Sequence, residues 1–295
     1  MKILVFGATG QVGTEIARRG AARGHDVTAL ARADADLTDP ASLAGAVMAH
    51  ECDAIINAAA YTAVDRAEDE EAIALAINGT APGVLAAAAA DKDVPFLHVS
   101  TDYVFDGAGP HLPADPTSPA NAYGRTKLVG EQLVQAAGGN ASVLRTSWVF
   151  SAHGHNFVKT MLRLGAQRDE LAVVGDQIGG PTWAGHIADA LIAVAQRMVE
   201  GKPGEILHFS GAPDASWADF ARGIFDQAGL DTRVSDIPTS TYPTPARRPL
   251  DSRMDCSSLA NWGVARPDWR EGLRMTLSEL GVLPGEWPAP AREPR

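Results

Sequence analysis

The sequence contains little cysteine, no signal peptide and no long apolar run. Its 295 residues include only Cys52 and Cys256, whose separation offers neither a disulfide framework nor the spacing of metal ligands. No apolar run approaches the ~20 residues of a membrane helix, and the short apolar start at residues 3–6 ends at a glycine instead of a cleavage site. We therefore expect a soluble, cytoplasmic protein of a reducing compartment that does not bind a membrane.

Positive charge is also scarce. Lys and Arg number 25 against 36 Asp and Glu, which gives a formal net charge of −11 and argues against a surface for nucleic acid. A local group of arginines can still bind a small anionic ligand. The hydrophobic share of 45% is ordinary for a globular protein, and the length allows a nucleotide-binding domain with a smaller appended lobe.

The first half of the chain alternates strand-like and helix-like segments. Thr38 or Asp39 before Pro40, for example, suits the start of a helix. Such alternation is typical of parallel strands joined by right-handed crossovers. We therefore predict an α/β fold with a Rossmann-like doubly wound parallel sheet. The strands are expected at Lys2–Phe6, 26–31, Ala54–Asn57, 95–100 and 142–146, and the helices at 11–23, from 40, at 65–90 and at 122–137.

The alternation of strand-like and helix-like segments becomes less regular after Phe150, and the last stretch is rich in proline and arginine. We predict a dinucleotide-binding domain over residues 1–150 that carries the catalytic residues. Residues 151–295 would form mostly a smaller, loop-rich substrate-binding lobe, with some segments returning to the first domain. The expected elements are helices at 156–167, Ala184–Val199 and Trp217–Ala228 and strands at 171–174 and Ile206–Phe209.

A glycine-rich loop lies between the first strand and the first helix. Gly7 suits a tight turn, Gly10 a close approach of the backbone to a pyrophosphate, and Gly13 close packing of helix on strand. The N-terminus of the helix offers free N–H groups to phosphates. A flexible turn is the alternative, but the placement after a strand and before a helix favours dinucleotide binding. The predicted contacts here are Gly7, Thr9, Gly10, Gln11, Val12 and Gly13.

The end of the second strand indicates which cofactor is bound. Arg32 stands where an acidic residue would select NADH, and a guanidinium favours the 2′-phosphate of NADPH. Arg32 as a solvated surface charge is the alternative, so we expect NADPH and leave NADH open. Asp36 and Leu37 lie where the adenine edge would rest. After the third strand, the small side chains of Ala59 and Ala60 would let the cofactor lie against the backbone.

A tyrosine and a lysine four residues apart provide the catalytic signal. Tyr123 and Lys127 would share one helix face, and the ammonium would lower the tyrosine pKa from about 10 so that the phenol can protonate a carbonyl under reduction. Lys127 can also bind the nicotinamide ribose. An exposed pair is the alternative. Thr101, at the C-terminal end of the fourth strand, adds a hydroxyl that can stabilise the developing oxyanion.

Six further runs are distinctive: NAAAYTAVD at 57–65, STDYVF at 100–105, YGRTK at 123–127, RTSWV at 145–149, NFVKTML at 156–162 and PTPARRPLDSR at 243–253. Together they resemble the dTDP-4-dehydrorhamnose reductase family, a branch of the extended short-chain dehydrogenase/reductases. The resemblance implies that NADPH reduces the C4 keto group of dTDP-4-dehydro-β-L-rhamnose to give dTDP-β-L-rhamnose. Hydride would reach C4 of the sugar while Tyr123 protonates its oxygen.

The resemblance also implies further site residues. Asp102 and Trp148 would lie close to the sugar, and a lone Trp is otherwise usually a core residue. Arginines of the late loop would hold the diphosphate bidentately. The full substrate set is Thr101, Asp102, Trp148, Val64, Asp65, Asn156, Arg247, Arg248 and Arg253, and the added cofactor contacts are Ala60, Tyr61, Thr62, Val99, Tyr123 and Lys127.

Two other functions and a metal stay under consideration. A non-catalytic NADP-binding regulatory subunit would not need Thr101, Tyr123 and Lys127 together. A nucleotide-sugar epimerase would recycle its hydride, and a dehydratase would carry a second acid beside Asp102. Some relatives pair through a divalent ion, and Glu15 could be a ligand, but residues 185–186 are Gly-His where another acid is expected. We predict no metal, a dTDP-linked 4-keto-6-deoxy sugar as partner, and a monomer or homodimer.

Overall fold

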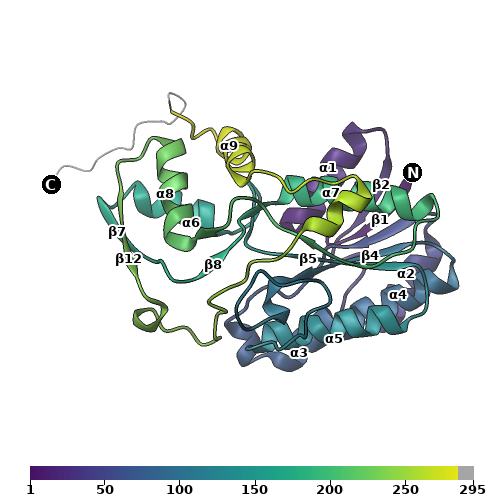
Figure 1. Ribbon diagram of the computed structural model, residues 1–295. Coiled ribbons are helices and arrows are strands. Elements are labelled where there is room, and N and C mark those ends of the chain that lie inside the picture. Colours follow the sequence, from purple (N-terminus) through teal and green to yellow (C-terminus); the bar gives the residue numbers. More distant parts are fainter. Residues whose placement is uncertain (285–295) are drawn as a thin grey trace.

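A six-stranded parallel sheet forms the centre of the computed structural model, which describes residues 1–284 (Figure 1). Each neighbouring pair in the order β10-β5-β4-β3-β1-β2 is parallel, so the predicted Rossmann-like sheet is confirmed. The strands are β1 (Lys2–Phe6), β2 (Asp26–Leu30), β3 (Ala54–Asn57), β4 (Phe96–Thr101), β5 (Ala141–Thr146) and β10 (Ile206–Phe209). The strand order reverses between β1 and β3, which is where ligands bind in such sheets, at the carboxyl ends of the strands.

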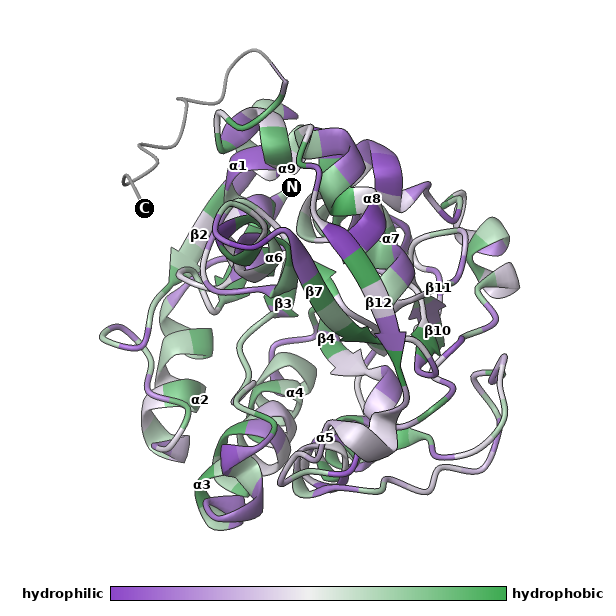
Figure 2. Cartoon of the chain, turned by 90° about the vertical axis from the view of Figure 1, so that its left-hand side faces the viewer, coloured by the Kyte–Doolittle hydropathy of each residue, from purple (hydrophilic) through white to green (hydrophobic). Residues whose placement is uncertain are grey.

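Helices cover both faces of this sheet. Helices α1 (Gln11–Ala22) and α7 (Ala184–Val199) pack against each other on one face. Helices α2 (Pro40–Ala49), α4 (Ala81–Asp91) and α5 (Ala122–Ala136) cover the other (Figure 1). The strands between them are buried on both sides, so the sheet is largely apolar (Figure 2), and β3 is fully buried and apolar from Ala54 to Ile56.

Capping residues set the starts of these helices. Asp39 accepts from the Ala41 and Ser42 N–H groups at the start of α2, with Pro40 in the first turn, as predicted. The Asn121 side chain accepts from the Gly124 N–H at 2.8 Å, which starts α5 two residues before Tyr123. The position of α5 is therefore fixed at the end that carries Tyr123.

A second, smaller core lies beside the sheet, on the left of Figure 1. The chain enters it after β5 and returns through α7 and β10 to the main sheet, so parts of the second half belong to the Rossmann-like layer. The division at residue 150 stays a prediction. This core and its borders contain β6 (Val149–Phe150), α6 (Phe157–Gly165), β7 (Glu170–Val174), β8 (Ile178–Gly179), β9 (Thr182–Trp183), β11 (Ala215–Ser216), α8 (Trp217–Ala228), β12 (Arg233–Ile237) and α9 (Trp269–Glu279).

One helix was not predicted, and one expectation needs correction. Helix α9 follows the proline-rich stretch, where Asp268 caps it and Trp269 packs edge-on against Phe220. The helical run Glu71–Asp91 is long and apolar enough to cross a membrane by length and composition, whereas no such run was expected from the sequence. It comprises α3 (Glu71–Leu75), the π-helical turn η2 (Ala76–Thr80) and α4, and half of its most apolar window is buried inside the protein.

Candidate active site

The glycine loop has the close contacts that its residues require. Gly7 has φ +99°, and a Cβ there would lie 2.7 Å from the Ala59 nitrogen. A Cβ on Gly13 would lie 2.0 Å from the Gly7 oxygen, so only glycine lets α1 start this close to the turn. Gly10 is the N-cap of α1 and brings no side chain, and the first turn holds no acid. The N–H groups of this helix end therefore remain available to a phosphate.

The residues after β2 lie beside this loop, because the Leu30 carbonyl accepts from the N–H groups of Gly7 and Ala8. Arg32 is exposed, and its Nε lies 3.4 Å from Asp36 Oδ2. Asp36 also accepts from the Thr38 backbone and hydroxyl, and the backbone bond is the main reason that the pKa of Asp36 is lowered. Arg32 is therefore free to turn toward a ligand at the end of β2.

The segment after β3 is held to the catalytic helix by Asn78. Its side chain accepts from the Tyr61 N–H at 2.8 Å and donates to the Tyr61 carbonyl and to the Thr126 hydroxyl. Asn78 lies in η2, and single π-helical turns are frequent at functional sites. Predicted cofactor contacts from two elements, Tyr61 with Thr62 and Tyr123 with Lys127, are thereby tied together.

The predicted catalytic hydroxyls meet at the carboxyl end of β4. The Thr101 hydroxyl donates to Asp102 Oδ1 at 3.0 Å and accepts from the Tyr103 N–H at 3.1 Å, and it is close enough to Tyr123 to lower the pKa of that phenol. Gly124 permits this approach, because a Cβ there would lie 2.2 Å from the Tyr103 carbonyl oxygen. Asp102 is 2% exposed, and within residues 1–284 its Oδ2 has no hydrogen-bond partner. Burial raises the pKa of Asp102 to about 7.

The electrostatics of Tyr123 differ from the expectation. Burial raises the pKa of Tyr123 to about 12, and the Thr101 hydrogen bond opposes that rise. Lys127 does not supply the expected lowering, because its Nζ lies 2.7 Å from the Val99 carbonyl and 3.1 Å from His98 Nε2. Burial also lowers the pKa of Lys127 to about 7. The prediction that Lys127 lowers the pKa of Tyr123 is therefore wrong for the protein without ligands.

Trp148 occupies a strained position on the substrate side. Its φ is +47°, unusual for a bulky residue, and such strain is common at functional sites. Its ring stacks on Trp217 with centroids 3.6 Å apart and lies against Gly179, where a Cβ would come within 2.7 Å of it. Trp217 in turn donates to Gln177 Oε1 at 3.2 Å. Trp148 therefore lies at the border of the second core, half-buried, and not at the centre of a core.

The three predicted arginines have different surroundings. Arg248 donates to Asp65 Oδ2 at 2.8 Å, while its buried Nη1 has no partner among the residues that the structure describes. Arg247 is exposed and pairs with Asp106 at 3.0 Å. Arg253 is held by both oxygens of Asp251 at 2.6 and 2.9 Å. Arg247 and Arg248 line a cavity of about 520 Å³ with Asp176, Thr239, Ser240, Tyr242, Pro243, Thr244, Pro245 and Leu250.

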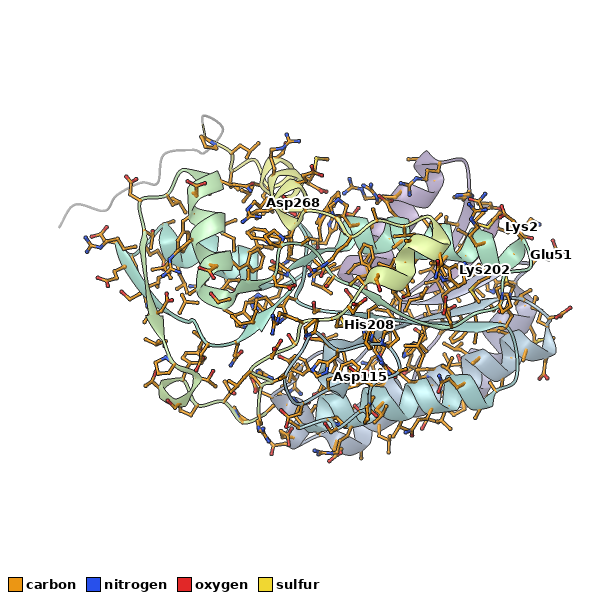
Figure 3. The ribbon with its side chains drawn as sticks, viewed as in Figure 1. Lys2, Glu51, Asp115, Lys202, His208 and Asp268 are labelled. Atoms are coloured by element: carbon orange, nitrogen blue, oxygen red, sulfur yellow. The ribbon has the colours of Figure 1, made fainter. Side chains whose placement is uncertain are left out.

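Backbone contacts fix the arginine loop beside Tyr123. Asn121, the N-cap of α5, donates its side-chain N–H to the Arg247 carbonyl at 2.8 Å. Asp65 accepts from the Ala246 N–H at 3.2 Å. The predicted substrate residues Asp65, Arg247 and Arg248 are therefore brought to the same edge as the tyrosine. This edge is opposite the exposed Lys2–Glu51 pair, which Figure 3 labels at the amino end of the sheet.

Asn156 and Glu15 have structural partners of their own. Asn156 caps α6 and donates to Gln11 Oε1 at 2.9 Å. It therefore lies beside the glycine loop and not beside the three predicted arginines. Glu15 lies with His153 and Glu279, not with His186, and ligand atoms of the three lie within 4.8 Å of one another. Arg18 Nη1 donates to Glu279 and lies 3.4 Å from Glu15. The Arg18 guanidinium thus pairs with both of these carboxylates. The absence of a metal stays a prediction.

Sequence reasoning assigned no role to His98 or to the side chain of Asn57. Both are fully buried: His98 contacts Lys127, and Asn57 contacts His98 from the other side of its ring. The available signal was alternation in β4, which places the polar residues His98 and Ser100 on one face of an otherwise apolar strand. Their partners on α5, Lys127 and Glu131, are four residues apart and share one face of that helix.

Comparison with known proteins identifies the family. Residues 1–282 match the RmlD substrate binding domain. A dTDP-4-dehydrorhamnose reductase of Burkholderia thailandensis is 46% identical over 296 residues, which cover 95% of this chain and 99% of the relative.

Two crystal structures share the fold over nearly their whole length. The dTDP-4-dehydrorhamnose reductase of Clostridium acetobutylicum has a TM-score of 0.89 at 35% identity, covering 95% of this chain and 99% of that one. The Bacillus anthracis reductase in complex with NADP has a TM-score of 0.88 at 32% identity, with 94% and 99% covered. The chain therefore belongs to the RmlD substrate binding domain family, whose members named here are dTDP-4-dehydrorhamnose reductases, and the resemblance seen in its motifs is confirmed.

Proposed function

We propose that this chain is an NADPH-dependent reductase that converts dTDP-4-dehydro-β-L-rhamnose to dTDP-β-L-rhamnose. The relatives carry this activity in their names, and one of them is described with NADP bound. The observation that carries the proposal is the meeting of Thr101 and Tyr123 at the carboxyl end of β4. The glycine loop lies at the same edge of the sheet, as binding of a dinucleotide beside the reacting carbonyl requires.

The cofactor fits the residues that are present. The uncapped start of α1 and the close-packed Gly7 and Gly13 form a cradle for a pyrophosphate. Arg32 at the end of β2 would bind the 2′-phosphate, and Lys127 would bind the ribose. When bound, the reduced nicotinamide supplies the hydride for the sugar C4.

The chain supplies the proton and the electrostatic stabilisation. A pKa of about 12 keeps Tyr123 protonated at neutral pH, so it can donate its hydroxyl proton to the C4 oxygen as that oxygen becomes an alcohol. Thr101 donates to Asp102 in the structure, and its hydroxyl proton would turn from Asp102 to the C4 oxygen to stabilise it while negative charge develops. Asp102 Oδ2, which has no hydrogen-bond partner within residues 1–284, can accept from a sugar hydroxyl. Tyr123 is left as a phenolate, which requires a cation nearby.

On the substrate side, Arg248 is the best placed of the three arginines to hold the diphosphate. Its Nη1 is buried beside a cavity of about 520 Å³ and is without a partner within residues 1–284, whereas Asp251 already engages Arg253. Trp148 would pack against the sugar from the border of the second core. The dTDP-linked 4-keto-6-deoxy sugar is thus the proposed partner. Cytoplasmic location, and a monomer or homodimer, stay predictions.

The test is consumption of NADPH by the purified chain. We expect oxidation of NADPH, followed by its absorbance, only when the 4-keto sugar nucleotide is added, with one alcohol formed per NADPH. Tyr123→Phe should lose turnover and keep cofactor binding. An epimerase would instead convert the sugar without net consumption of NADPH, and a regulatory subunit would bind NADPH without turnover. Either of those results would overturn the proposal.

A further inference from the structure

Lys127 is a buried lysine that pairs with no carboxylate among residues 1–284. It is 1% exposed and contacts two groups, the Val99 carbonyl at 2.7 Å and His98 Nε2 at 3.1 Å. The carbonyl can only accept a hydrogen bond, so Nζ donates to it. The histidine can donate or accept, and its tautomer therefore determines which charge state of the lysine it supports.

Asn57 fixes that tautomer. The Ala59 backbone N–H can only donate, and it lies 3.1 Å from Asn57 Oδ1, which sets the orientation of the amide. The amide nitrogen of Asn57 therefore faces His98 Nδ1 at 3.2 Å and donates to it. Nδ1 then carries the lone pair, and the proton of a neutral imidazole lies on Nε2. Burial holds the pKa of His98 well below its usual range, so the ring is neutral.

The proton on Nε2 points to the lysine. An ammonium has three donors and no acceptor, so it cannot receive this hydrogen bond, whereas an amine can. The hydrogen bonds from Asn57 to His98 and from His98 to Lys127 can therefore both form only when Nζ is the neutral amine. The lowering of the Lys127 pKa by burial agrees with this hydrogen-bond pattern.

The charged groups that surround Lys127 do not change this balance. Glu131, one turn along α5, attracts a proton to Lys127, but burial has the larger effect. The two Glu131 oxygens are already bound by Arg145 of β5, and one of them also accepts from Ser100 of β4. From β4 and β3 the groups next to the lysine are His98 and, behind it, Asn57.

We propose that Asn57 and His98 are positioning residues that hold Lys127 as an uncharged amine in the ligand-free protein. The proposal deepens the proposed function, because a neutral Lys127 cannot balance the Tyr123 phenolate until it takes up a proton from solvent. Ala59, which orients Asn57, contacts the glycine loop at Gly7, so the relay begins at the cofactor site. The protonation of the catalytic lysine is thereby connected to the surface that the cofactor would cover.

The experiment is an NMR titration of the ligand-free full chain labelled at histidine nitrogens and lysine side-chain carbons. In the wild type we expect the His98 proton on Nε2 and a Lys127 that titrates near neutral pH. Asn57→Asp keeps an oxygen for the Ala59 N–H but accepts from Nδ1, so the proton moves to Nδ1 and Nε2 becomes an acceptor. The pKa of Lys127 should then rise by roughly one to three units.

Two further variants keep the test decisive. His98→Gln can offer an oxygen to Lys127 and should also raise its pKa, and it identifies the His98 signals. Asn140→Asp is the matched control. The Asn140 amide donates to the Lys202 carbonyl and accepts from the Gly204 N–H, away from Lys127, so this change should leave the Lys127 titration unaltered. A Lys127 that is charged across pH 6–9 in the wild type, or that titrates identically in Asn57→Asp, would overturn the proposal.

The NMR result does not depend on the identity of the substrate. If the reductase assay fails while Lys127 titrates as expected, the proposed function is wrong and the relay stands. In an active enzyme, kcat/KM for NADPH should fall as pH rises through the Lys127 pKa, and Asn57→Asp should move that fall to higher pH. A merely structural role for Asn57 would lower activity equally at every pH.

Discussion

The regions around Arg145 and around Lys127 each bury a cation beside the central sheet, but they compensate it differently. Arg145 is 2% exposed, and its guanidinium is bound by both oxygens of Glu131 at 2.7 to 3.2 Å. It also donates to the Pro113 carbonyl and lies 3.3 Å from His208, labelled in the middle of Figure 3. Lys127, equally buried, contacts a carbonyl and an imidazole within the described part of the chain.

The partners of each buried group determine whether its charge is permanent or titrates near neutral pH. A buried ion pair that is fully hydrogen-bonded keeps both charges over a wide pH range, because each partner stabilises the other. A buried amine without a carboxylate partner can release its proton close to neutral pH. Both arrangements occur on one face of α5, where Lys127 and Glu131 are a turn apart. Two residues of the proposed reaction site, Lys127 and Asp102, have a pKa of about 7.

Among the variants considered, Lys127→Met should have the largest effect, a loss of catalytic activity. We expect kcat/KM to fall by about 10²- to 10⁴-fold, the usual contribution of acid–base groups. The fold should persist, because Met occupies a similar volume and removes an unpaired buried amine. Steady-state kinetics and a thermal melt check both parts. If Lys127→Met unfolds the protein, the two cations have the same structural role.

Arg145→Met should have the converse effect. It leaves Glu131 as a buried charge without its partner, and we expect the free energy of unfolding to fall by about 3–5 kcal/mol. Arg125→Met is the matched control, since Arg125 pairs with Glu71 at 3.0 Å on the surface and should contribute less than about 1 kcal/mol. Denaturant titrations of the three proteins measure the difference. Equal losses for both variants would contradict the distinction between buried and exposed pairs.

Sequence reasoning succeeded where the determinants are local. Ala184–Val199, Ile206–Phe209 and Trp217–Ala228 were placed to the residue, because apolar periodicity and end signals lie within each segment. Ser216, for example, forms a capping box with Asp219. The glycine loop was also readable, since each glycine has a steric reason within one strand–turn–helix unit.

Sequence reasoning failed where a property depends on contacts between elements that are far apart in the sequence. The spacing of Tyr123 and Lys127 predicts that they share a helix face, but the pKa of Tyr123 depends on burial and on Thr101 from β4. No spacing along the chain indicates that His98 contacts Lys127, or that a partly buried Asp251 pairs with Arg253. Such partners follow only from the packing of one element on another.

The pH dependence of stability should distinguish the two regions by a smaller amount. The unfolded chain keeps the Lys127 proton up to a pKa of about 10.4, whereas the folded protein releases it near pH 7 because burial lowers that pKa to about 7. Between these values the unfolded state binds more protons, so the free energy of unfolding should rise with pH, by on the order of a few kcal/mol. Lys127→Met should abolish this rise, and Arg145→Met should retain it. Denaturation midpoints measured from about pH 7 to 9.5 provide the test; a rise that survives in Lys127→Met would assign it to another group.

Arg32 extends the comparison to a cation in solvent, and its replacement should have the smallest effect. Its side chain is 80% exposed and lies 3.4 Å from Asp36, so Arg32→Ala should leave stability unaltered. A bidentate guanidinium–phosphate contact at the ribose would be lost, and we expect NADPH to bind about tenfold more weakly while NADH is unaffected, a difference of ~1.4 kcal/mol. Fluorescence titration of both cofactors measures the ratio, and Arg233→Ala, also exposed but on β12 of the second core, is the control. Equal weakening of both cofactors would mean that Arg32 contributes only a general positive field, in which case the cofactor preference must arise elsewhere along the edge between β1 and β2.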